Sequence, residues 1–318
     1  MKRSLKDSIH QQREALAHML RKPLEQLAAH CARAWGNREA LDAVLRTGFP
    51  GIPHCSVLYC VGADGSQVCN NAGPRGAASS HPGRDPARRL HMKAAMSIRG
   101  FLLSEAYISP DEHRPSLTAL QAIHRNGRLV GHLGADFDLR DLPVSSELYD
   151  EPEDWRQVKG DPAIRSTVFQ QSRTESPLDR HLGLVLSILE ELLTARGVYQ
   201  CQIHFSNSLA TLWTLGDPLR YRILDHETLC DPDICLIYPP HPYPSDAAIA
   251  PNEVGRILDT LPTLRLTDPT IYLRMASINL INGMVSVTFS CDGSHYMPHG
   301  EFLKKDTSFW FGHDSSPR

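Results

Sequence analysis

The chain has 318 residues, of which 41% are hydrophobic and 22% charged, a composition typical of a soluble globular protein with one large core or two smaller ones. Its formal net charge is −3, with arginine and lysine scattered along the sequence. Nucleic acids and anionic membranes favour basic surfaces, so we expect neither as a partner.

No apolar run approaches the roughly 20 residues that span a bilayer. The N-terminus has a basic start, Met1 to Arg3, but it lacks the apolar core and cleavage site of a signal peptide. We therefore expect a cytoplasmic protein without a membrane span. The 8 cysteines lie mostly within apolar stretches, where buried and reduced thiols are the default for that compartment.

Residues 1–48 predict an N-terminal helical segment. Apolar residues recur at steps of three and four from Leu5 to Cys31, which gives one apolar stripe along a helix. Pro23 should kink or interrupt this helix, because proline lacks an amide donor and clashes with the preceding turn. A second short helix is expected over Arg38–Leu45.

Residues 49–143 predict a small α+β domain. An apolar segment, Cys55–Val61, is followed by a turn at Asp64-Gly65 and by a glycine-rich stretch, Asn70–Arg84, which we expect to be a loop. The region ends with a second apolar segment, Leu129–Leu139.

Several groups of residues in this region occur in a characteristic order. They are Asp64-Gly65, Gly83-Arg84-Asp85, Arg89, Ser104–Ser109, Arg114-Pro115 and Gly131–Leu139. With these groups the region resembles a PDC (Cache) sensor domain, the PAS-like ligand-binding module of bacterial receptors. The resemblance implies a PAS-like antiparallel sheet with a ligand pocket, beside a long N-terminal helix. In such sensors that helix often forms a homodimer interface; the alternative is a helix that only covers its own sheet.

The resemblance also implies which residues hold the ligand. In the resembled fold the acid that matches Asp136 faces the pocket, where it would bind an ammonium group. Arg89 could bind a carboxylate or phosphate through two parallel hydrogen bonds. Tyr107, Thr118 and Ser104 would supply hydroxyl groups that orient the ligand.

The same region allows a structural interpretation. Arg84, Asp85 and Arg89 could form only an ion-pair cluster, and Asp138 could cap or turn the chain. The resembled family commonly has proline and an aromatic residue after the matching arginine, where this chain has Leu90-His91. This departure favours an alternative in which the protein is a scaffold with a degenerate pocket.

After an acidic, proline-rich linker at residues 144–160, residues 161–312 predict a second α+β domain of unknown role. Helices are expected from Asp161 to Ser172, from Pro177 to Gly197 and over Pro251–Leu261. Strands are expected over residues 198–205, 209–215, 219–224, 234–238, 271–276 and 284–291. This domain resembles no family that its sequence identifies.

Four residues of the second domain allow an enzyme of the hydrolase type. They are His204, Cys291, Asp292 and His295. The chain has no Gly-x-Ser-x-Gly turn, phosphate-binding loop, dinucleotide fingerprint or metalloprotease motif. We therefore assign no catalytic residue, metal or cofactor, and we favour a non-enzymatic role with a hydrolase as the alternative.

Together these expectations describe a cytoplasmic bacterial sensor. Residues 49–143 would bind a small polar metabolite, such as an amino acid, an amine or a carboxylate-like molecule. The bound state would be transmitted through residues 161–312, a dimer mate or a downstream signalling protein.

Overall fold

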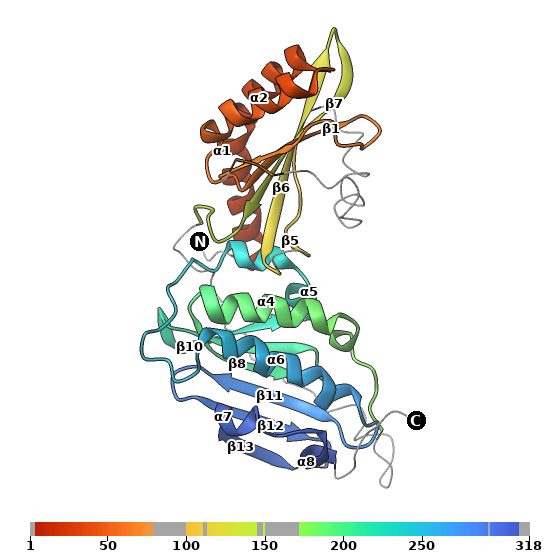
Figure 1. Cartoon of the computed structure of the whole chain (residues 1–318). Helices are drawn as coiled ribbons and strands as arrows, with labels where there is room; N and C mark the ends of the chain where they lie inside the picture. Colours follow the sequence, from red (N-terminus) through yellow and green to blue (C-terminus); the bar gives the residue numbers. More distant parts are fainter. Residues whose placement is uncertain are drawn as a thin grey trace. The chain divides into compact units, whose positions relative to one another are not determined.

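The computed structural model describes residues 4–74, 76–78, 100–110, 113–144, 149, 172–291 and 293–311. The chain divides into two compact units (Figure 1). We call residues 6–144 the N-terminal unit, and residues 145–318, with which the first five residues are grouped, the C-terminal unit. Among the described residues, no helix is both long and apolar enough to cross a membrane.

Two helices, α1 over Leu5–Ala34 and α2 over Arg38–Gly48, begin the N-terminal unit, and the short η1 over Phe49–Gly51 follows them. α1 continues through Pro23, so the helix is not interrupted there. The predicted apolar stripe is buried on both sides of this proline, and its packing outweighs the loss of one backbone hydrogen bond. Asn37 separates the two helices and caps α2 through its side chain.

The sheet of the N-terminal unit has seven strands in the order β3-β2-β1-β7-β6-β4, with β5 paired to β6, and all paired neighbours are antiparallel. The predicted α+β class, with an N-terminal helix and a PAS-like antiparallel sheet, is confirmed. The strands are β1 (Val57–Gly62), β2 (Asn71–Gly73), β3 (Gly76–Ala78), β4 (Phe101–Leu103), β5 (Tyr107–Ile108), β6 (Pro115–Arg125) and β7 (Arg128–Asp138).

The hairpin of β2 and β3 lies in the glycine-rich stretch that the sequence predicts as a loop. For these residues the prediction is wrong. Each strand has only three residues, which is too few alternating positions to produce a periodic signal.

The pairing register divides the side chains of this sheet between two faces. Residues directly opposite each other in antiparallel strands share a face. Cys60 of β1 is opposite Leu133 of β7, and the Cys60 thiol contacts Cys31 of α1, so this face lies toward the helices. Asp136 of β7 and Thr118 of β6 are opposite each other on the other face. The polar residues of interest therefore lie on the face away from α1.

The C-terminal unit is built on a six-stranded antiparallel sheet in the order β10-β9-β8-β11-β12-β13, with α4 and α6 across one face (Figure 1). Its elements are η3 (Leu178–His181), α4 (Leu182–Ala195), β8 (Val198–His204), β9 (Leu209–Thr214), β10 (Asp217–Asp225), α5 (His226–Leu229), η4 (Pro232–Leu236), α6 (Pro251–Leu266), β11 (Leu273–Asn279), β12 (Met284–Phe289), β13 (Ser294–Pro298), α7 (His299–Phe302) and α8 (Thr307–Phe311). Helix α4 is followed by three antiparallel strands, and α6 is followed by three more. The unit therefore contains a structural repeat that is not visible in the sequence.

The elements of this unit that differ from the sequence predictions include η4 and β13. Residues 234–238 are not a strand, because η4 occupies most of them. The side chain of Asp231 accepts a hydrogen bond from the amide of Asp233, and Pro232 stands in the first turn, so local capping prevails over the apolar run. Strand β13 was not predicted. The helix predicted over residues 161–172 lies outside the described residues.

Candidate functional site

Four of the five residues that the sequence predicts for ligand binding meet on one face of the N-terminal sheet. Thr118 Oγ1 donates a hydrogen bond to Asp136 Oδ1 at 2.8 Å, and Tyr107 Oη lies 3.0 Å from Thr118 Oγ1. Ser104 Oγ accepts a hydrogen bond from the Thr118 amide at 3.0 Å. The fifth residue, Arg89, lies outside the described residues.

Tyr59, which no pattern in the sequence singles out, belongs to the same network. Its hydroxyl donates to Asp136 Oδ1 at 3.1 Å. Tyr59 is opposite Gly134 in the pairing of β1 with β7, and a β-carbon at Gly134 would overlap the tyrosine ring. Glycine at this position therefore leaves the space through which the ring reaches Asp136. In the sequence, the sign of this contact is Gly134, two residues before Asp136. It can be interpreted only when the pairing register of β1 with β7 is known.

The hydroxyl protons of Tyr107, Thr118 and Tyr59 point along the network toward Asp136, whereas the Ser104 hydroxyl donates to the Glu105 carbonyl. A hydroxyl group has one proton, and that of Thr118 is donated to Asp136. In the contact between Tyr107 and Thr118, the Tyr107 hydroxyl is therefore the donor. Tyr59 donates to the carboxylate from the other side. An ionised carboxylate, which only accepts hydrogen bonds, fits the centre of such an arrangement.

The network is buried. Asp136 is only 6% exposed, and Tyr59 and Thr118 are buried as well. A carboxylate removed from water loses several kcal/mol of solvation, and hydroxyl donors compensate for part of that loss. A buried acid surrounded by hydroxyl groups on a sheet face is therefore a candidate binding position.

Asp138, two residues further along β7, has a different environment. Its Oδ1 atom accepts a hydrogen bond from the Arg140 amide at 2.8 Å, and its Oδ2 atom lies 3.5 Å from Arg114 Nη1. The carboxylate thus holds the turn that follows β7. The structural interpretation of Asp138 as a residue that turns the chain is confirmed.

The two histidines named for the hydrolase alternative do not come together. His204 lies on β8 and His295 on β13, three strands away. His295 is opposite the buried Val287, and its ring packs against Phe289 and Trp310 on the face with the helices. Burial lowers the pKa of His204, which lies on the opposite face of the sheet. A shared active site of these two histidines is therefore excluded, and Asp292 lies outside the described residues.

In the described ranges, no group of three or more histidine, cysteine, aspartate or glutamate side chains is arranged to hold a metal ion.

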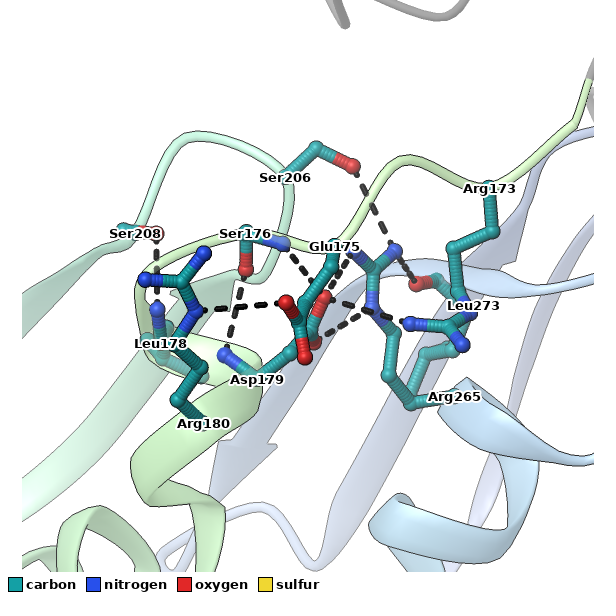
Figure 2. A network of polar contacts seen from close by, with 10 residues as sticks. All are labelled: Arg173, Glu175, Ser176, Leu178, Asp179, Arg180, Ser206, Ser208, Arg265 and Leu273. Carbon is teal, nitrogen blue, oxygen red and sulfur yellow. Dashed lines mark hydrogen bonds and ion pairs between the residues drawn. The ribbon is translucent and has the colours of Figure 1, made fainter.

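A second polar cluster lies in the C-terminal unit (Figure 2). Arg265 donates to both carboxylate oxygens of Asp179, from Nε at 2.8 Å and from Nη2 at 2.9 Å, and its Nη1 donates to the Leu273 carbonyl at 2.9 Å. Arg173 Nη1 lies 3.5 Å from the same carboxylate. The cluster joins η3, α6 and β11, and its charged groups face one another. We therefore assign it to stability rather than to ligand binding.

No family model matches the sequence, and no curated protein is significantly similar to it. Among solved structures, the chain is similar to the sensory domain of the Campylobacter jejuni chemoreceptor Tlp3 (CcmL) with isoleucine bound, at 15% identity and a TM-score of 0.34. That match covers 43% of this chain and 60% of the other. The ligand-binding domain of the Pseudomonas fluorescens chemoreceptor CtaA in complex with L-isoleucine is similar at 22% identity and a TM-score of 0.31, over 41% of this chain and 51% of the other.

The chain thus spans less than two thirds of the sensory domains that it matches. Both solved structures are sensory or ligand-binding domains of chemoreceptors. At this level of similarity, the ligands of those receptors do not carry over to this chain.

Proposed function

We propose that the N-terminal unit is a sensor that binds a small molecule with a protonated amino group on the sheet face that carries Asp136. The observation that supports this proposal is the buried carboxylate of Asp136, with the hydroxyl groups of Tyr59 and Thr118 donating to one of its oxygens. The resemblance of residues 50–143 to PDC (Cache) domains supports the same function.

The direction of the hydrogen bonds favours a cationic group in the ligand. The hydroxyl protons of Tyr59, Thr118 and Tyr107 are directed along the network toward Asp136. The network therefore presents negative charge and oxygen lone pairs, which attract an ammonium group and repel a carboxylate. A carboxylate elsewhere on the ligand would need a separate cation, and Arg89 is the residue that we propose for it.

The sensor acts by a shift between two conformations that bind the ligand with different affinity. The C-terminal unit, a dimer mate or a separate signalling protein reads that shift, and the protein works in the cytoplasm. His204 and His295 lie three strands apart and on opposite faces of the sheet, which favours this role over that of a hydrolase.

The test is a thermal-shift and calorimetric screen of the full chain against amines, amino acids and dicarboxylates. A ligand that binds only the folded protein raises the melting midpoint by mass action. Asp136→Asn should abolish binding, whereas Asp141→Asn, which changes an exposed carboxylate in the same unit, should leave the affinity unchanged. Tyr59→Phe and Thr118→Val should each weaken binding by about tenfold or more, because each loses a hydrogen bond to a charged group.

A comparison of simple amines with the matching amino acids tests whether Arg89 binds the carboxylate of the ligand. Arg89→Ala should weaken the binding of an amino acid but not of the matching amine. Binding that persists in Asp136→Asn would overturn the assignment of the site. A folded protein that binds no amine at all would favour the scaffold alternative, and one that binds only dicarboxylates would contradict the proposed cationic group.

A further inference from the structure

The sheet of the C-terminal unit has two unlike faces. Helices α4 and α6 lie across one of them, where Ile203 and Val287 are buried (Figure 1). In the part of the chain that the structure describes, no helix lies across the other face, whose side chains are half-buried. We call this second face the open face. Its middle row crosses four strands and consists of Thr211, Gln202, Ser277 and Ser286.

The open face is almost free of charge. The row beside the middle one contains Trp213, Gln200, Asn279 and Met284, so neither row has an ionisable side chain. In the third row the ionisable side chains are His204 on β8 and the exposed Asp225 on the edge strand β10. Burial lowers the pKa of His204, so its ring is neutral at pH 7. Since 22% of the whole chain is charged, this face has the depletion of charge that is typical of the centre of a protein interface.

The polar groups of the open face can pair with themselves. Each glutamine, asparagine, serine and threonine side chain carries both a donor and an acceptor. In a two-fold symmetric contact the same patch meets itself, so a charge at its centre would face its own copy and repel it. No such charge is present in the two rows. The amide of Asn279 donates to Gln200 Oε1 at 3.0 Å, which holds these two side chains along the sheet.

The size of the open face and its margins also fit a partner of this kind. Six strands about 4.8 Å apart, each about 20 Å long, give an area of roughly 500 Å². Two copies would then bury about 1,000 Å² in total, which reaches the lower bound for a specific interface. Tyr221 on β10 is 54% exposed and Tyr296 on β13 is 67% exposed, so the sheet has an exposed aromatic side chain on each of its two edge strands.

The β10 edge of the sheet is a poorer place for a partner. Strand β10 carries Pro218 and the exposed Arg220, and its pairing register shifts between Asp217 and Tyr221. Proline, exposed charge and a bulge all discourage the addition of another strand. A partner is therefore expected on the face of the sheet and not as an added strand beside β10.

We propose that the open face is the interface of a homodimer, in which it packs against the same face of a second copy of this chain. This interface differs from the N-terminal helix that the sequence resemblance implies.

The test uses the full chain in sedimentation-velocity experiments over a range of concentrations. Gln202 lies at the centre of the open face, so in a two-fold contact the two Gln202 side chains are near each other. Gln202→Glu and Gln202→Lys should each raise the dimer dissociation constant by about a hundredfold or more, because like charges are then brought together. An equimolar mixture of the two variants should recover the dimer. Asn252→Glu, an exposed substitution on α6, should leave the dissociation constant unchanged.

Circular dichroism and melting midpoints establish that each variant is folded. If a Gln202 variant fails to fold, the same pair of charges at Thr211 replaces it. A wild-type chain that remains monomeric at high concentration overturns the proposal, and so does a dimer that neither Gln202 variant weakens. A dimer that dissociates only with Ala15→Glu, on the exposed side of α1, would place the interface on the N-terminal helix instead.

Discussion

The guanidinium group of Arg265 donates two parallel hydrogen bonds to the carboxylate of Asp179. The Arg265 side chain is 0% exposed and the Asp179 side chain 2%. Charges in such a position are compensated only by each other and by neighbouring polar groups. Asp179→Asn leaves the arginine charge buried without its partner, and the free energy of unfolding should fall by about 3–5 kcal/mol. Denaturant unfolding followed by circular dichroism measures this change.

The matched control is Glu175→Gln. Glu175 and Arg180 form an exposed ion pair at 3.2 Å, and its loss should cost at most about 1 kcal/mol. The double variant Asp179→Leu with Arg265→Met should recover much of the stability, because apolar residues of similar volume need no charge compensation. If Asp179→Asn costs no more than Glu175→Gln, the buried pair is not important for stability.

The same pair predicts how stability depends on pH. Burial acts to raise the pKa of Asp179, but hydrogen bonds from Arg265 and Ser176 outweigh it and hold the pKa below its usual value. The unfolded carboxyl has a pKa of about 3.9, so the pair stabilises the fold above about pH 4. This contribution is lost as the pH falls through the lower pKa of the folded protein. Between pH 7 and pH 3, Asp179→Asn should therefore lose less stability than the wild type, and parallel pH profiles would contradict the assignment.

Gly134→Ala tests the packing that brings Tyr59 to Asp136. The added β-carbon would overlap the tyrosine ring, so the ring must move and its hydrogen bond to Asp136 should weaken. We expect a loss of about 1–3 kcal/mol in the free energy of unfolding, together with weaker ligand binding. Gly51→Ala is the control, because nothing lies within 4 Å of a β-carbon there. Equal stability of the two variants would show that the ring is not confined by Gly134.

Thiol reactivity should single out Cys291. It is exposed, whereas Cys201 and Cys235 are buried, and burial raises the pKa of both thiols. Burial also raises the pKa of Cys55 to about 12. Because the thiolate is the reactive form, a disulfide reagent at neutral pH should modify Cys291 first. Cys291→Ser should abolish the fast phase of the reaction and Cys201→Ser should not; a fast phase that survives Cys291→Ser would show that another thiol, such as the half-buried Cys230, reacts as fast.

The part of the candidate site that could be predicted from the sequence is the part built from neighbouring segments. Strands β6 and β7 form a hairpin around Asn126-Gly127, both with positive φ, and a register shift between Ile123 and His124 then brings Thr118 opposite Asp136. Tyr59 is 77 residues away from Asp136 and reaches it only after β1 pairs with β7. Nothing in the local pattern around Tyr59 specifies that register.

The errors in the C-terminal unit have related causes. The buried run at residues 234–238 has no alternation that separates a strand from a helical turn, and the cap at Asp231 decides the outcome. Strand β13 alternates between exposed and half-buried residues at the edge of the sheet, so it lacks the apolar signal of an inner strand. His204 and His295 seemed able to cooperate because a sequence shows neither the order of strands nor the face on which a side chain lies.

The position of Arg265 has a consequence for how the C-terminal unit unfolds. Arg265 lies near the end of α6, in the second set of one helix and three strands, whereas Asp179 lies just before α4, in the first. Repeats in solenoid proteins contact only their neighbours and can open one after another. If one half of this unit separated from the other, Asp179 and Arg265 would each lose the opposite charge that compensates it. The separation would also break the pairing of β8 with β11 at the centre of the sheet. The two halves should therefore melt together as a single cooperative block, despite their repeated architecture.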